Sequence, residues 1–241
     1  MKLFVDQAKD ISFVPKSVLI ALSISLLLQI SWHHYFSELE ITRTDLPNAT
    51  QAPYIKLVSL SDTITASKLT MLWLQSFDNQ PGLSISLQDL DYERVINWLD
   101  LILKLDSKTQ YPLFAAIRFY AEVQNENKQR EMIQFVSEKF LEKPNERWAS
   151  MAHAVYIAKY RVEDLNLALN CAKLIRQYAK GENVPYWAKQ MEIFILEDMG
   201  ELESAMVLIG GLLESGELKD SHQQQFLGQR LEELKQRQEE Q

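Results

Sequence analysis

Apolar residues recur in this 241-residue chain about every 37 residues, and this repeat restricts the fold more than any other feature. The first members of the repeated triplets are spaced 37, 36 and 37 residues apart. A repeat of this length is typical of stacked helix–turn–helix units. The aligned triplets are Val95, Leu99, Ile102; Met132, Val136, Phe140; Ala168, Ala172, Ile175; and Ala205, Ile209, Leu212.

The first helix of each unit also opens on a recurring aromatic residue, at Tyr111, Trp148 and Trp187. In the third unit, Trp148 starts a buried face that continues at Ala152, Val155 and Ala158, with the three- to four-residue spacing of a helix. We expect Trp148 and Trp187 to be buried between units.

Boundary residues agree with this division into helices. Pro144 and Pro185 fall between units, where a proline does not interrupt a helix. Asp164 is predicted to cap the second helix of the third unit. Gly200 is predicted to form the tight turn inside the fourth unit.

The predicted fold class is all-α, with a helical repeat domain over residues 61–215. We expect four hairpins that stack into an α-solenoid, because a single hairpin cannot bury both of its faces. The first hairpin carries a longer internal connection, from Asp78 to Asp91. The hairpins are predicted at residues 61–105, 109–142, 146–179 and 184–214.

The C-terminal segment, residues 216–241, is rich in Gln, Glu and Arg and predicts a polar helix. Its apolar stripe is consistent with a capping helix that closes the solenoid, or with a coiled-coil partner helix. The stripe consists of Phe226, Leu227, Leu231 and Leu234.

Residues 17–36 contain no Asp, Glu, Lys or Arg and are long enough for one membrane-spanning helix. Trp32 and Tyr35 stand at the far end of this segment, where aromatic rings favour the membrane interface. A cleaved signal peptide has a similar pattern, but its cleavage site needs small residues after the apolar run. We therefore predict an uncleaved transmembrane anchor, preceded by an N-terminal tail (1–16) and followed by an extended linker (37–60).

Orientation depends on the lysines and arginines that flank the anchor. Lys2, Lys9 and Lys16 precede it, whereas Arg43 and Lys56 follow it. Because positive residues remain in the cytoplasm, the pattern favours a cytoplasmic N-terminus. In a bacterial host, the chain would then be a single-pass inner-membrane protein with its repeat domain in the periplasm.

The repeat resembles the tetratricopeptide repeat. The residues that carry the resemblance are Trp148, Ala152 and Pro144 around the third unit, and Trp187, Gly200 and Ala205 in the fourth. Residues 104–107 (Lys-Leu-Asp-Ser) are similar to the tetrad that ends helices in this family, with Ser107 in place of proline. The period is slightly longer than the 34 residues of the family. Residues 57–60 and 72–75 also look like the opening hairpin of bacterial membrane-anchored members.

Composition excludes several other classes of function. Seven glycines and one cysteine leave little scope for phosphate-binding loops, disulfide frameworks or all-cysteine zinc sites. The net charge of −8, without a basic tract, argues against nucleic acid as a partner. No catalytic or nucleotide-binding motif is present, so we expect no enzymatic activity, no cofactor and no metal. Cys171 is expected to pack as a small hydrophobic residue.

The resemblance implies that the first helices of successive units line a concave, partner-binding face. The candidate partner-binding residues by this analogy are Phe119, Tyr120, His153, Tyr156, Tyr160 and Glu192. Family members that clamp a peptide carboxylate use Lys, Arg and Asn at such positions, and those residues are mostly missing here. We therefore do not predict that mode of binding.

The function expected from these features is that of a membrane-tethered scaffold or assembly factor, which docks another protein through its helical repeats. Its partner is expected to be a membrane protein or membrane complex. The alternative is a permanent accessory subunit of such a complex, with the anchor packed against other spans through Ser17, Ser23, Ser25 and Ser31.

Overall fold

The computed structural model describes residues 14–36, 45–59, 62–77, 79–80, 83–84, 86–216 and 220–239. The predicted tail before Val14 and the first part of the predicted linker, before Asp45, lie outside these residues. The chain divides into two units, residues 1–43 and 44–241. The described residues are helical except for short connections and one pair of two-residue strands, as the predicted all-α class requires.

The first unit contains one described element, the helix α1 (Lys16–Phe36). It begins one residue after Pro15 and covers the predicted anchor, residues 17–36. Between Lys16 and His33 it is long and apolar enough to cross a membrane, and none of that stretch is buried. A signal sequence near the N-terminus would have the same length and composition.

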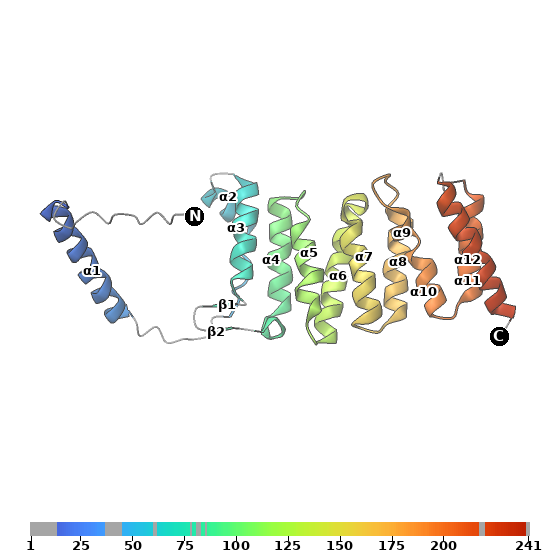
Figure 1. Cartoon of the computed structure of the whole chain (residues 1–241), viewed down its shortest axis with the longest axis horizontal. Coiled ribbons are helices and arrows are strands. Elements are labelled where there is room, and N and C mark those ends of the chain that lie inside the picture. Colours follow the sequence, from blue (N-terminus) through green and yellow to red (C-terminus); the bar gives the residue numbers. More distant parts are fainter. Residues whose placement is uncertain are drawn as a thin grey trace, which may run out of the picture. The chain divides into compact units, whose positions relative to one another are not determined.

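The second unit is a row of helices in which each one packs against the next along the chain (Figure 1). Its helices are α2 (Ala52–Val58), α3 (Thr63–Gln75), α4 (Tyr92–Leu105), α5 (Tyr111–Arg118), α6 (Glu126–Glu142), α7 (Pro144–Tyr160), α8 (Leu165–Tyr178), α9 (Tyr186–Lys189), α10 (Met191–Asp198), α11 (Leu202–Glu214) and α12 (Ser221–Glu239). Short 3₁₀ helices, η2 (Leu87–Asp89) and η3 (Tyr120–Glu122), lie before α4 and after α5.

The predicted hairpins correspond to α3–α4, α5–α6, α7–α8 and α9/α10–α11. In the fourth hairpin the first helix is interrupted at Gln190, between α9 and α10. In the first hairpin the long connection contains an antiparallel pair, β1 (Asn79–Gln80) with β2 (Leu83–Ser84).

The linker prediction is wrong for residues 52–58, which form α2. Pro53 lies in the first turn of α2, where a proline costs a helix nothing. The residues directly before α2 also pack against the repeat domain, at α4. Leu46 is buried, its carbonyl oxygen accepts a hydrogen bond from Arg94 Nη1 at 2.6 Å, and the carbonyl of Pro47 accepts one from Trp98 Nε1 at 2.8 Å.

The helices start in two main ways. The first helices α5 and α7 have a proline in their first turn, and Pro185 precedes α9. The second helices α4, α6 and α8 start at a capping side chain, because Asp91, Asn125 and Asp164 accept hydrogen bonds from their backbones. Two helices depart from this pattern: α3 is capped by Asp62, and α11 has no side-chain cap. The predicted cap at Asp164 is confirmed, and Gly200 has the positive φ (+78°) of the predicted turn.

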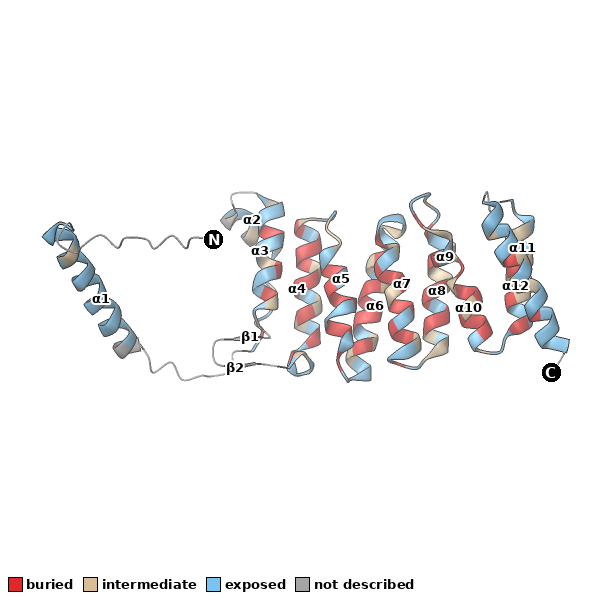
Figure 2. Ribbon diagram, in the orientation of Figure 1, coloured by how far each residue is buried: buried red, intermediate tan, exposed pale blue. Residues whose placement is uncertain are grey.

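The repeated apolar column forms the core of the second unit. Every member except the partly buried Leu212 is at most 1% exposed. Figure 2 shows buried residues along the helices from α3 onward, whereas none of the described side chains of α2 is buried. Within α12, Leu227 and Leu234 are buried against the core and Leu231 is partly buried, whereas Phe226 is 48% exposed. The helix α12 packs on α11, as a capping helix would.

Polar contacts between units reproduce the sequence period, because they join residues 34 to 39 positions apart. Arg130 pairs with Asp164 at 2.8 Å, and Arg161 with Glu122 at 2.7 Å. Asn145 accepts a hydrogen bond from the backbone of Gly181 at 2.7 Å, 36 residues further on. Each unit is therefore joined to the next one by the same kind of link.

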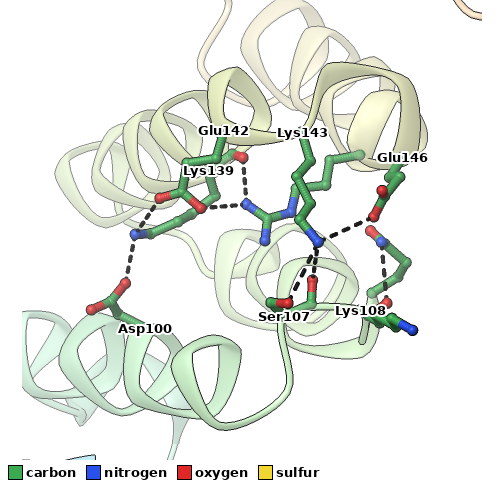
Figure 3. A network of polar contacts seen from close by, with 9 residues as sticks. Asp100, Ser107, Lys108, Lys139, Glu142, Lys143 and Glu146 are labelled. Carbon is green, nitrogen blue, oxygen red and sulfur yellow. Dashed lines mark hydrogen bonds and ion pairs between the residues drawn. The ribbon is translucent and has the colours of Figure 1, made fainter.

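One such network connects α4, α6 and α7 (Figure 3). Lys139 on α6 lies between the carboxylates of Asp100 on α4, at 2.5 Å, and Glu142, at 2.9 Å. The buried Arg147 of α7 donates to the carbonyl oxygen of Lys139 at 2.6 Å and to Glu142 at 2.7 Å. Lys143 donates to the carbonyl oxygen of Ser107 at 3.0 Å. These bonds hold α4, α6 and α7 in register.

Candidate protein-docking face

Exposed aromatic side chains gather on the first helices of successive hairpins. We call the aromatic face the set of Tyr111 and Phe114 on α5, Phe119 directly after it, Tyr156 and Tyr160 on α7, and Trp187 on α9. Each of these side chains is between 42% and 55% exposed. Monomeric soluble domains rarely expose this much clustered aromatic surface without a binding role.

The spacing of these residues explains why they share one face. Tyr111 and Phe114 are three residues apart on α5, and Tyr156 and Tyr160 are four apart on α7, so each pair lies on one side of its helix. The opposite sides of the same helices carry small buried residues, such as Ala116 and Ala154, which pack into the core.

Ring contacts connect the aromatic residues along α5. Tyr111 stacks on Phe114 with centroids 6.1 Å apart, and Phe114 meets Phe119 edge-on at 5.8 Å. The guanidinium of Arg118 lies 5.9 Å from the centre of the Phe114 ring. Arg118 thus extends this cluster toward α7.

A hollow of about 660 Å³ lies between α5, α7 and α9. Arg118 and Glu122 line it on one side, His153 and Tyr156 in the middle, and Trp187 on the far side. The imidazole of His153 stacks on Tyr156 with centroids 5.3 Å apart, and Tyr156 contacts Tyr160 at 5.0 Å. The hollow is therefore an aromatic recess with one cation and one carboxylate at its edge.

His153 contributes a polar atom to this recess. Burial, together with the nearby charge of Arg118, lowers the pKa of its imidazole, so the ring is neutral at pH 7. Its Nε2 atom is buried and has no hydrogen-bond partner among the described residues. A neutral imidazole in this position can form one hydrogen bond with the backbone of a docked peptide.

Of the six residues predicted to bind a partner, four lie on or beside this face: Phe119, His153, Tyr156 and Tyr160. The prediction is wrong for Tyr120, which is only 3% exposed. It starts η3, where the chain turns inward after α5, and its carbonyl oxygen accepts a hydrogen bond from Tyr92 Oη at 2.6 Å.

Glu192 does not lie on the aromatic face. Its side chain is 6% exposed and forms an ion pair with Arg176 of α8. The side of α10 that carries Glu192 therefore faces α8. There the guanidinium of Arg176 compensates the charge of the buried carboxylate.

Sequence reasoning missed Phe114, Arg118 and Trp187 as parts of the face. Trp187 was expected to be buried between units, but it is 53% exposed and lines the hollow. Phe114 and Arg118 stand three and seven residues after Tyr111, on the side away from the buried Ala116. This helical spacing is the sequence signal that could have placed Phe114 and Arg118 on the face.

The described residues can be compared with the requirements of a metal site and of a reactive thiol. No group of three or more His, Cys, Asp or Glu side chains among them is placed to hold a metal ion. Cys171 is buried as predicted, and burial raises the pKa of its thiol to about 11. A thiol of this kind is a poor nucleophile.

No protein-family model, curated protein or solved structure matches this chain. The function is therefore argued from the surface of the molecule itself.

Proposed function

We propose that this chain is a non-enzymatic, membrane-tethered scaffold or assembly factor, which docks another protein on its aromatic face. The observation that carries the proposal is the run of six half-exposed aromatic side chains along α5, α7 and α9. Aromatic residues supply large contact areas at a low entropic cost and dominate the energy of many protein interfaces.

A tetratricopeptide-like α-solenoid is the architecture that we propose for the second unit. Two observations support it: each helix packs on the next, and polar links join residues one repeat apart. Such stacks expose the side chains of their first helices along one extended surface, which suits a peptide or a helix of a partner.

The proposed tether is α1. Its 21 residues span about 31 Å as a helix, close to the thickness of the hydrocarbon core of a bilayer. Tethering raises the effective concentration of the docking face for membrane partners. We propose a bacterial inner membrane, with a cytoplasmic N-terminus and a periplasmic repeat domain, from the excess of lysines before the span.

A reporter that is active only in the periplasm, fused after Gln241, tests the topology. Activity of the fusion, together with resistance of the full chain to alkaline extraction from membranes, is the expected result. A processed chain that lacks α1 would favour a signal peptide and overturn the tether.

Docking is tested by site-specific photo-crosslinking in intact membranes. A crosslinker at Tyr156 or at Trp187 should give the same protein adduct, since both residues line one hollow. The matched control is Gln134, an exposed residue of α6 that does not line this hollow. Adducts of equal yield from Gln134 would contradict docking on the aromatic face.

A second candidate function, a permanent accessory subunit of a membrane complex, is favoured by apolar side chains exposed on α2 and α3. Large exposed apolar surfaces are typical of stable subunit interfaces. Tyr54, Leu57, Ile64, Leu69 and Leu72 are each between 55% and 76% exposed. Mild detergent extraction followed by gel filtration separates the two candidates, because only a permanent subunit stays in a stoichiometric complex.

A further inference from the structure

A second groove lies beside the fourth hairpin and is separate from the aromatic hollow. We call it the α8–α11 groove: it has a volume of about 690 Å³, α8 and α11 form its walls, and α9 and α10 form its floor. Tyr186 and Glu192 face it, whereas Trp187 and Met191 face the aromatic hollow. Because successive residues of a helix turn by about 100°, neighbouring residues here point to different sides.

One side of α11 in the groove carries mostly small residues. Ser204, Val207, Gly211 and Ser215 line the groove with the spacing of one helix side. Val207 is 71% exposed, and a Cβ atom placed on Gly211 would meet no other atom within 4 Å. Glycine at such a position lets a second backbone approach closely.

A buried polar group without a hydrogen-bond partner in the described chain lines the groove. Gln190, at the break between α9 and α10, is only 6% exposed and lines the groove. Its side-chain Nε2 is buried and finds no hydrogen-bond acceptor among the residues that the structure describes. A buried donor without an acceptor is costly, so an occupant that supplies an oxygen atom here would be stabilised.

The charge of the groove defines the chemistry of that occupant. Four cations line it, Lys173, Arg176, Lys180 and Lys189, against two carboxylates, Glu192 and Glu203. Arg176 is paired with Glu192. Neither Lys173 nor Lys180 forms an ion pair within the described chain, although the protein as a whole has a net charge of −8. This local excess of positive charge is complementary to an acidic ligand.

We propose that the α8–α11 groove is a docking site for an acidic, amphipathic peptide segment of a partner protein. Carboxylates of the segment pair with Lys173 and Lys180, and one of its oxygen atoms accepts the hydrogen bond from Gln190 Nε2. Its apolar side lies over Val207 and Gly211. The groove shares no lining residue with the aromatic hollow, so this proposal holds or fails independently of the proposed function.

The test selects peptides from a displayed library of random 13-residue sequences, the length of α11. The bait is the full chain in nanodiscs. We expect the recovered peptides to be enriched in Asp and Glu beside apolar residues, and to bind more weakly as salt rises. Failure to recover any peptide, or recovery of peptides without acidic residues, would overturn the proposal.

Variants then locate the binding site. Lys173→Glu/Lys180→Glu should weaken peptide affinity by about tenfold or more, since it replaces two attractions with two repulsions. Gly211→Leu should also weaken it by filling the groove, and Gln190→Met by removing the donor. Circular dichroism checks that each variant stays folded.

Two controls distinguish this site from the rest of the surface. Lys56→Glu/Lys68→Glu makes the same charge change on α2 and α3, away from the groove, and should leave affinity within about twofold. Trp187→Ala alters the aromatic face and should also leave it unchanged. Peptides that bind less well to Trp187→Ala but equally to the groove variants would refute the site. A dimer of the chain that the groove variants dissociate would show that a second copy is the occupant instead.

Discussion

Trp148 on α7 and Trp187 on α9 meet edge to face, with their ring centroids 5.5 Å apart. The two residues stand at corresponding positions of successive hairpins, 39 residues apart. Trp148 is partly buried against the core, whereas Trp187 is 53% exposed and lines the aromatic hollow. One ring of the pair therefore packs against the core, and the other leaves about half of its surface exposed in the hollow.

Alanine substitution should separate these two roles. Trp148→Ala is expected to reduce the free energy of unfolding by about 2 kcal/mol, less than the loss for a fully buried tryptophan. Trp187→Ala is expected to cost about 1 kcal/mol or less but to abolish crosslinking from Tyr156. Urea unfolding followed by circular dichroism measures the first effect. Equal losses of stability in both variants would contradict the division of roles.

Arg147 should be the most sensitive charged residue of the repeat domain. It is 2% exposed and joins α7 to the C-terminal end of α6 through the carbonyl oxygen of Lys139 and through Glu142. Arg147→Ala leaves a cavity and an unpaired buried carbonyl, so we expect a loss of about 3 kcal/mol on urea unfolding. Arg147→Met should lose less, because it keeps most of the volume.

The matched control for Arg147 is Arg130→Ala. Arg130 also joins two helices through its ion pair with Asp164, but its side chain is 39% exposed. Exposed pairs contribute about 1 kcal/mol or less. A loss for Arg147→Ala no larger than that for Arg130→Ala would show that burial of the guanidinium is unimportant.

Asp100 should make stability depend on acidic pH. Burial raises the pKa of its carboxyl, but hydrogen bonds from Lys104 and Lys139 outweigh burial and hold that pKa below its ordinary value of 3.8. A carboxylate with a lowered pKa stabilises the fold above its unfolded pKa, and this contribution disappears as pH falls through its folded pKa. The contacts of Asp100 with Lys104 and Lys139 are together expected to contribute about 1 kcal/mol to the free energy of unfolding at pH 7.

Asp100→Asn removes this titration. The variant should be less stable than the wild type at pH 7, and the difference should narrow as pH falls below about 4. Urea unfolding at a series of pH values measures it. A difference that stays constant from pH 7 to pH 3 would mean that Asp100 acts through packing and not through its charge.

Most of the repeat domain could be predicted because its information is local and periodic. The buried column through Val95, Met132, Ala168 and Ala205 follows from helical spacing alone, and so does the cap at Asp164. The helix α2 was missed because Pro47 and Pro53 suggested an extended chain. A proline in the first turn is equally compatible with a helix start.

The binding face was harder to predict because exposure depends on which neighbours cover a helix. Trp187 has the sequence position of a core residue. In the structure, however, its neighbours in the hollow cover only about half of its side chain. Tyr120 follows an exposed Phe119 but turns inward, because the chain tightens into η3 there. Glu192 finds a cation from another helix, Arg176, which periodicity within one helix does not reveal.

Cys171 should resist alkylation in the folded chain. Its side chain is buried on α8, and burial raises the pKa of the thiol to about 11, with only a small opposing effect from Ser137. At pH 8 only about one thiol in a thousand is then ionised, and alkylating agents react with the thiolate. Mass spectrometry after iodoacetamide treatment should find no adduct until urea unfolds the domain. Rapid labelling of the native chain would mean that α8 opens locally.

Glu163 should be replaceable by glycine with a gain in stability. It joins α7 to α8 with a φ of 58°, in the left-handed region, at the place where the next hairpin has Gly200 with a φ of 78°. A residue with a Cβ atom is strained in this conformation, and glycine is not. Glu163→Gly is therefore expected to raise the free energy of unfolding by about 1 kcal/mol. The reverse change, Gly200→Ala, should lower it by a similar amount, because a Cβ atom there meets no other atom within 4 Å and only the backbone is strained. Urea unfolding of both variants tests the pair, and shifts of the same sign would contradict the equivalence of the two turns.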